Sequence, residues 1–197
     1  MLNLRPDYDK ATLAPMTEQE FRKAYPLIAG WIKQTLAEHA SAARPVASFG
    51  FSRLPHYYDE QLLASSMVVL VPRVPVPPLS AMGFDRFCDF EQMDARGTTY
   101  LNTYFVRADQ SHSESLHFHE LVHVIQWRLL GPEKFLALYA DGLERFGYRK
   151  SPLERMAFRV QKRFERGAQP FSVEAACQSL MRETARPGDS PAPLNGL

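Results

Sequence analysis

The segment Glu114-Ser-Leu-His-Phe-His-Glu-Leu-Val-His-Val-Ile-Gln-Trp-Arg-Leu-Leu130 has the clearest local pattern in this 197-residue chain. Its apolar stripe recurs at helical spacing and consists of Leu116, Val122, Ile125 and Leu129. Gly131 and Pro132 follow, and these residue types commonly end a helix. We therefore predict a helix over residues 114–130.

This predicted helix contains the pattern His119-Glu120-Leu121-Val122-His123. Residues four apart lie on the same face of a helix, so the two imidazoles can bind one metal ion. Zn²⁺ in such sites lowers the pKa of a bound water to about 7 and polarises the carbonyl under attack. Glu120 lies where it can accept a proton from that water. The pattern predicts a zinc-dependent metallohydrolase of the peptidase type, with Glu120 as general base.

Zinc requires a third protein ligand, and three downstream carboxylates remain open: Glu144, Glu154 and Glu165. A third His at the spacing H-E-x-x-H-x-x-G-x-x-H is absent. Glu154 is our choice, although it also stands three residues after Ser151 and could complete a capping box at the start of a helix. Glu144 is the alternative, because its separation from His123 is close to that in thermolysin-like enzymes.

Several runs in the second half of the chain occur in an order known from one family: Thr99–Val106, His119–Gln126, Gly131–Phe135 with Tyr139, Gly147-Tyr148, and Ser151-Pro-Leu-Glu154 with Ala157. They resemble the gluzincin-type zinc metallopeptidases found as small bacterial domains. In that family a helical H-E-L-x-H-V-x-Q precedes a Tyr and an Asn-Pro-Leu-Glu-x-x-Ala segment. The resemblance covers about residues 97–160 and implies that Glu154 is the third ligand. Ser151 replaces the family's usual Asn and can still cap a helix.

The resemblance also bears on side chains around the motif. A strand containing Asn102 and Tyr104 would lie along the cleft and pair with an extended substrate. Tyr148 could donate a hydrogen bond to the oxyanion that forms during hydrolysis, although a half-buried aromatic residue without this role is the simpler interpretation. His117 precedes His119 by two residues and lies on a different helix face, so we expect it not to bind the metal, and nearby His112 is not a predicted ligand either.

The remaining sequence predicts helices over 18–40, 132–144, 152–167 and 173–182, and strands over 67–71 and 98–106. Thr17 and Glu20 form a capping box for the first helix, whereas Pro26 should kink or break it near Tyr25. Phe135, Leu136, Leu138 and Tyr139 should face inward. Residues 44–59 are expected to form a loop with a short strand near 47–51. Residues 72–78 contain four prolines and are expected to cross the surface in an extended conformation.

We therefore expect an α+β, zincin-like fold, in which a small mixed or antiparallel sheet packs on the motif helix and on a following helix that bears the glutamate. One domain should span residues 1–186, with an N-terminal region 1–96 and a catalytic core 97–186. Residues 187–197 should form a flexible tail.

Composition limits the classes of partner. The chain has 23 Lys and Arg against 22 Asp and Glu, so no net field favours nucleic acid or an anionic membrane. It has neither a signal-peptide pattern nor an apolar run of about 18 residues, and only Cys88 and Cys177, which we expect to be unpaired. We expect a cytoplasmic protein that binds Zn²⁺ and a peptide or protein substrate.

Two other functions are consistent with the residues. The first is a non-catalytic, zinc-stabilised binding module in which the aromatic segment 49–58 holds a protein partner. Glu120 argues against it, because a purely structural zinc site does not need this carboxylate and usually has four protein ligands. The second is a hydrolase that acts on a non-peptide amide or ester.

Overall fold

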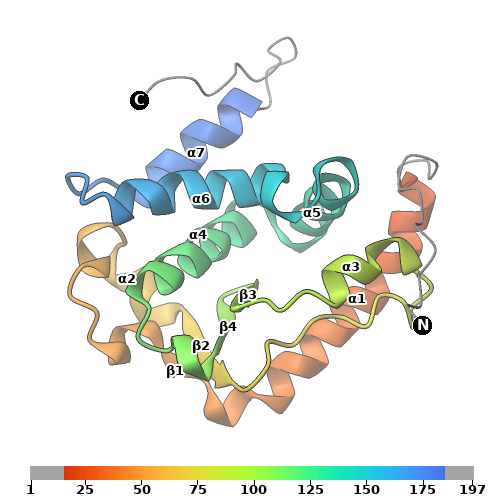
Figure 1. Cartoon of the computed structure of the whole chain (residues 1–197), viewed down its shortest axis with the longest axis horizontal. Coiled ribbons are helices and arrows are strands. Elements are labelled where there is room, and N and C mark those ends of the chain that lie inside the picture. The colour runs from red at the N-terminus through yellow and green to blue at the C-terminus, as the bar shows by residue number, and fades with distance from the viewer. Residues whose placement is uncertain (1–15, 185–197) are drawn as a thin grey trace, which may run out of the picture.

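A computed structural model describes residues 16–184 of the chain, and the predicted tail 187–197 lies outside them. This part combines seven α helices with one four-stranded sheet (Figure 1). The helices are α1 (Glu18–Glu38), α2 (Glu60–Ser65), α3 (Cys88–Glu91), α4 (Glu114–Leu130), α5 (Pro132–Phe146), α6 (Pro152–Glu165) and α7 (Val173–Thr184). The strands are β1 (Arg44–Pro45), β2 (Met67–Val71), β3 (Gly97–Tyr100) and β4 (Thr103–Arg107). The expected α+β class is confirmed.

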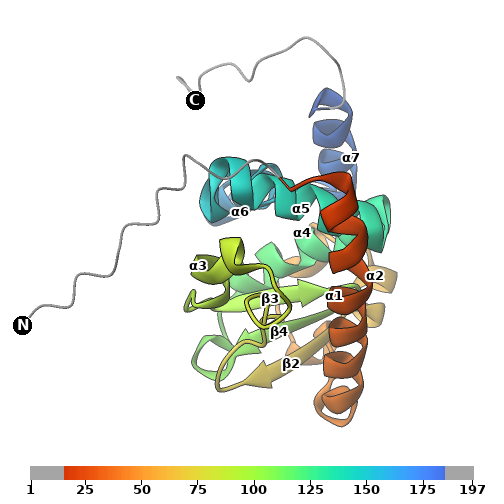
Figure 2. The same cartoon turned by 90° about the vertical axis from the view of Figure 1, so that its right-hand side faces the viewer.

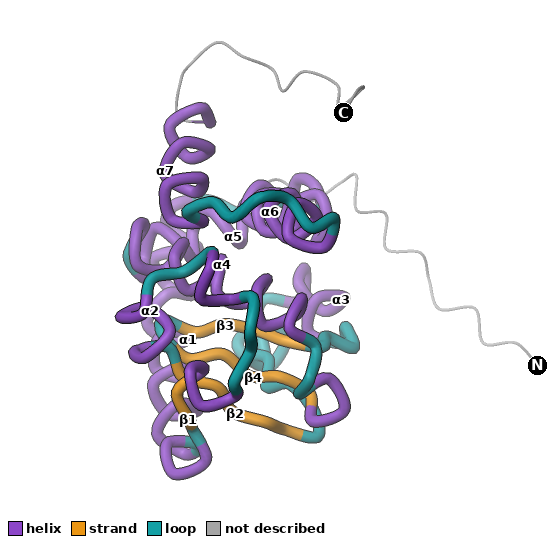
Figure 3. Tube along the Cα trace, turned by 90° about the vertical axis from the view of Figure 1, so that its left-hand side faces the viewer, coloured by secondary structure: helices purple, strands orange, loops and turns teal. Residues whose placement is uncertain are grey.

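The sheet is mixed and has the strand order β1-β2-β4-β3. β2 and β4 are parallel, with Val69 opposite Phe105, whereas β1 pairs antiparallel with β2 and β3 with β4. β3 lies at the edge nearest α4, as Figure 3 shows. The strand order therefore places an edge strand beside the helix that carries the two histidines.

Helices cover both faces of this sheet because successive strand residues point to opposite sides. Val69 and Phe105 belong to one apolar cluster with Ile32 of α1. Val68 and Tyr104, one position away in each strand, belong to a second cluster with residues of α4, α6 and α7. In Figure 2, α1 runs along the right-hand side of the strands, and α4 to α6 lie above them. α4 is thus enclosed between the sheet and the later helices.

Most predicted helices are present. The helix predicted over 114–130 coincides with α4, and α1 begins with the predicted capping box of Thr17 and Glu20. The predicted break at Pro26 is wrong: α1 continues through this residue, which lies on the exposed side, where water can bind the carbonyl that loses its partner. Leu138 is 41% exposed, so it does not face inward as predicted.

Two strand predictions need correction. The run 98–106 forms two strands joined by a tight turn, in which Leu101 has a φ of 59°. The run contains no Gly or Pro, so its β-forming residues dominated the prediction, and Asn102, a common turn residue, was the only local sign of the turn. Residues 46–49 form a 3₁₀ helix instead of a strand, with the Ser48 hydroxyl donating to the Pro45 carbonyl.

Other expectations agree with the structure. Residues 67–71 form β2, and 72–78 have neither helix nor strand. Cys88 and Cys177 both lie in the described region, and both are free thiols. Among the helices of residues 16–184, none has the length and apolarity needed to cross a membrane.

Replacing Leu101 with Gly should stabilise the protein. A left-handed backbone costs an L-residue about 1–2 kcal/mol, and glycine avoids this cost. Glycine also makes the unfolded chain more flexible, which offsets about 0.4–1 kcal/mol of the gain. We expect Leu101→Gly to raise the free energy of unfolding by about 0.5–1 kcal/mol, measured by urea denaturation. Leu101→Ala keeps the left-handed cost and should not stabilise. A destabilised Gly variant would show that the Leu101 side chain outweighs the backbone term.

Candidate metal centre

The helix that carries the histidines is buried on all sides in its middle. Every residue from His117 to Trp127 is buried, including the charged or polar side chains of His119, Glu120 and His123. A helix enclosed in this way cannot send its polar groups to solvent, so each must find a partner inside the protein.

The structure brings together three of the predicted site residues. The Nε2 atoms of His119 and His123 are 3.1 Å apart. Glu154 of α6 reaches both: its Oε2 lies 3.3 Å from Nε2 of His119, and its Oε1 lies 3.4 Å from Nε2 of His123. These side chains form a buried group that could hold a metal ion.

Two glutamines orient the imidazoles. Nδ1 of His119 lies 2.9 Å from Oε1 of Gln161, and Nδ1 of His123 lies 2.7 Å from Oε1 of Gln126. The amide nitrogens of both glutamines donate elsewhere, Gln126 to the Leu153 carbonyl and Gln161 to Ser115 and Glu165. Each amide oxygen therefore accepts from Nδ1–H. This places the lone pair of the neutral imidazole on Nε2, toward Glu154.

Glu154 is 2% exposed, and its two carboxylate oxygens differ in their partners. Oε1 accepts a hydrogen bond of 2.8 Å from the hydroxyl of Tyr139 in α5. Oε2 is buried and has no hydrogen-bond partner among the described residues. A buried carboxylate oxygen without a donor, next to two imidazole nitrogens, fits the ligand set of a divalent cation.

The capping-box interpretation of Glu154 is wrong. The Ser151 hydroxyl makes no cap hydrogen bond at the start of α6, and it has no partner within residues 16–184. Glu154 instead points toward α4. The start of α6 packs closely against Gly142 of α5. A Cβ on Gly142 would lie 2.9 Å from Pro152 Cδ and from Ser151 Cβ, so only glycine allows this packing.

The other candidate ligands lie elsewhere. Glu144 accepts hydrogen bonds from the Arg86 guanidinium at 2.9 Å and from the Met16 amide at 2.7 Å. Glu165 accepts from the Ser115 hydroxyl at 2.5 Å. Neither belongs to the group of His119, His123 and Glu154. His117 lies outside it too, between the Tyr104 hydroxyl at 2.8 Å and the Ser111 carbonyl at 3.0 Å, as expected for a non-ligand.

Glu120 faces the edge strand β3 beside this group. Its Oε2 accepts a hydrogen bond of 2.7 Å from the Thr99 hydroxyl, and its carboxylate packs against Gly97, where any Cβ would overlap Oε1. Burial raises the pKa of Glu120, while the two imidazoles and the Thr99 hydrogen bond oppose this effect. The strand thus holds a carboxylate with increased proton affinity next to the two histidines.

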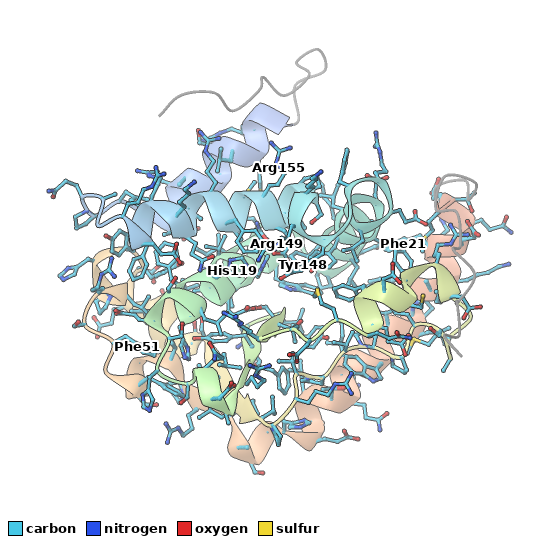
Figure 4. All side chains as sticks on the ribbon, viewed as in Figure 1. Phe21, Phe51, His119, Tyr148, Arg149 and Arg155 are labelled. Atoms are coloured by element: carbon cyan, nitrogen blue, oxygen red, sulfur yellow. The ribbon has the colours of Figure 1, made fainter. Side chains whose placement is uncertain are left out.

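Tyr148 lines the same pocket as Glu120, His123 and Glu154. Its ring lies between Phe90 and Phe158, with centroid distances of 6.5 and 6.4 Å. Figure 4 places it near His119. Burial raises the pKa of Tyr148, and the carboxylates of Glu154 and Glu120 raise it further, so the phenol keeps its proton at neutral pH.

Charge in the three-residue group is balanced internally. Burial opposes the ionised form of Glu154, but His123 and His119 outweigh it and lower the pKa of Glu154. Burial likewise disfavours the charged form of His123, yet the Glu154 carboxylate raises the pKa of His123 to about 9. A cation bound here would replace the proton on the Nε2 atom of His123.

Comparisons with protein-family models, with curated proteins and with solved structures found no match for this chain. The case for a function therefore depends on the geometry of the site.

The family resemblance includes Gln126 and Tyr139 but gives neither a role, and sequence reasoning missed Gln161. Gln126 lies three positions after His123 and shares its helix face, so helical spacing alone could have suggested the contact. Tyr139 comes from another helix, and its bond to Glu154 could not be inferred from spacing. Gln161, also on another helix, gave no signal.

Gln161→Leu should weaken metal binding. His119 would lose the acceptor that orients its ring, and such losses typically reduce metal affinity by about 10- to 100-fold. Zinc affinity can be measured by competition with a chromophoric chelator. Gln178→Leu is the matched control, since Gln178 is also partly buried and hydrogen-bonded, to Glu174 on α7. Equal affinities of the two variants would show that Gln161 does not support the ligand.

Proposed function

We propose that this chain is a zinc-dependent hydrolase of the gluzincin type, with a zincin-like fold, that cleaves amide bonds, peptides among them. His119, His123 and Glu154 would hold the ion. The observation that carries the proposal is the approach of two imidazole Nε2 atoms to a buried carboxylate whose Oε2 has no hydrogen-bond donor among the described residues.

The spacing of the three side chains suits zinc. Ligand atoms about 2.0–2.2 Å from a tetrahedral zinc lie about 3.3–3.6 Å from one another. The two Nε2 atoms here are 3.1 Å apart, and each lies 3.3–3.4 Å from one oxygen of the Glu154 carboxylate, His119 from Oε2 and His123 from Oε1. Two histidines and one carboxylate also match the ligand set of known catalytic zinc sites, which keep a fourth position for water or substrate.

Zinc in such a site supplies a Lewis acid that polarises a carbonyl group and makes water a better nucleophile. Glu120 would accept the proton from the attacking water and pass it to the leaving amine. Burial raises the pKa of Glu120, which strengthens the carboxylate as a proton acceptor. Thr99 and Gly97 hold its carboxylate in place.

Tyr148 and β3 would position the substrate. The Tyr148 phenol could donate a hydrogen bond to the carbonyl oxygen as that oxygen gains negative charge. β3 is an edge strand, so an extended peptide could pair with it. The carbonyl of Thr99 already accepts a hydrogen bond from the Trp127 indole at 3.0 Å, so we expect pairing nearer Gly97.

The alternative, a binding module that uses the aromatic segment 49–58, has less support. Leu54, Tyr57 and Tyr58 are buried, and Phe49 and Phe51 pack against the same core cluster. The rings of Phe49 and Phe51 lie 5.3 and 4.5 Å from the His117 ring. Most of this segment contributes to the protein's own interior and offers little aromatic surface to a partner.

Glu120→Gln should abolish most hydrolysis while zinc binding persists. Loss of a general base typically slows catalysis by about 10²- to 10⁴-fold, and the amide that replaces the carboxylate keeps a similar shape but is a far weaker proton acceptor. The measurement pairs a peptide-library assay with zinc analysis of each sample. A chelator should abolish hydrolysis by the parent protein. An unchanged rate in the variant would remove Glu120 from the mechanism.

Tyr148→Phe should lower kcat by about 100-fold and leave zinc affinity unchanged, as for other oxyanion donors. Steady-state kinetics on a cleaved peptide can measure this effect. Tyr25→Phe, on α1, controls for loss of a phenol elsewhere. If Tyr148→Phe retains full kcat, the residue is only part of the pocket wall.

A further inference from the structure

A long pocket leads away from the candidate metal centre. It is lined mainly by apolar side chains and is partly open to solvent. On one side its wall is α1, which contributes Phe21, Ala24, Ile28 and Ile32. These residues recur at helical spacing over about three turns, which corresponds to a length of about 16 Å. The pocket is therefore extended along the helix.

Two further elements complete the wall. α5 contributes a second stripe, from Phe135 through Ala140 to Leu143, over about 12 Å of its axis. The segment 76–95 covers the space with apolar side chains that include Phe84 and Phe90. This segment is held to both helices by Arg86, which forms ion pairs with Glu20 at 3.1 Å and with Glu144 at 2.9 Å.

Polar groups gather at only one end of this pocket. Glu120, His123 and Glu154 belong to the metal centre, and Tyr148 lies beside them. Of the other polar lining residues, Thr99 donates to Glu120 and Tyr139 to Glu154, whereas the lining residues of α1 are all apolar. The described lining thus changes from charged to almost wholly apolar with distance from the site.

This gradient suits a substrate with one reactive polar end and a long hydrocarbon chain. A single aromatic side chain is too short for a channel of about 16 Å. A peptide segment of that length would place about four residues in the channel, and their amide groups would find few hydrogen-bond partners there. A hydrocarbon chain has no such requirement, and about twelve carbons would span the length at about 1.3 Å each.

We propose that the pocket binds a long, unbranched acyl chain and that the scissile bond is the amide joining this chain to an amine. This deepens the proposed function and rests on it for the chemistry. Water would add its oxygen to the acyl carbon, the C–N bond would break, and the amine would leave with the proton carried by Glu120. The products are a fatty acid and a free amine, and no other reactant is needed.

The first test measures binding, without catalysis. N-acylglycines with acyl chains of about four, eight and twelve carbons are titrated calorimetrically into the metal-free protein and into the zinc-loaded Glu120→Gln variant. We expect affinity to rise by about three- to fourfold per methylene until the channel is full. An affinity independent of chain length would overturn the proposal, as would equally strong binding of an acetylated phenylalanine peptide.

Substitutions in the pocket wall test where the acyl chain binds. Ala140→Phe places a ring in the channel from α5, and we expect it to weaken binding of the twelve-carbon compound by at least about tenfold while sparing the four-carbon compound. Ala137→Phe makes the same change on the same helix at a residue outside the lining, and it should bind like the parent. Ala95→Phe narrows the channel from the segment 76–95 and serves as a second test if Ala140→Phe destabilises the fold. Equal affinities across the three variants would refute the assigned channel.

Hydrolysis of the same compounds separates the two proposals. Chain-length-dependent binding without hydrolysis would support the channel and contradict the hydrolase. Zinc-dependent cleavage of short peptides, with no preference for acyl chains, would support the hydrolase and contradict the channel.

Discussion

The approach of the Glu154 carboxylate to two imidazoles inside the protein is the interaction on which the rest of the structure depends. A buried charge is costly unless it is paired, and all three side chains are almost completely buried. The group therefore determines how closely three helices must pack. α4 supplies the imidazoles, α6 the carboxylate and α5 the tyrosine that binds one of its oxygens. Gly142 makes the approach of α5 to the start of α6 sterically possible.

A second set of contacts orients the side chains of the site. Gln126 and Gln161 hold the imidazoles from behind, so that both Nε2 atoms face the carboxylate. β3 supports Glu120 from the other side through Thr99 and the glycine at position 97. His119, Glu120 and His123 all lie on α4, but the side chains that support the imidazoles differ from those that support Glu120. A change in one set of supports need not displace the other, so the proposed metal binding and the proposed proton transfer can be tested separately.

The N-terminal half of the chain has a different role from the half that carries the motif. α1 covers one face of the sheet and, with the segment 76–95, forms an apolar wall beside the candidate metal centre. The family resemblance covers only about residues 97–160, so it says nothing about this wall. If the site hydrolyses amides, the chemistry belongs to the second half of the chain, and the choice of substrate is made largely by the first.

The sequence by itself determined the helix over 114–130 and the shared face of His119 and His123, because both follow from spacing within one helix. It could not decide between Glu144, Glu154 and a cap, since the carboxylate that reaches α4 depends on how α5 and α6 pack. It also missed the turn at Leu101, where no glycine marks the left-handed backbone. Only the tertiary structure brought Gln161, Tyr139 and the apolar wall to the site. These contacts join residues far apart in the chain, and no local pattern encodes such distances.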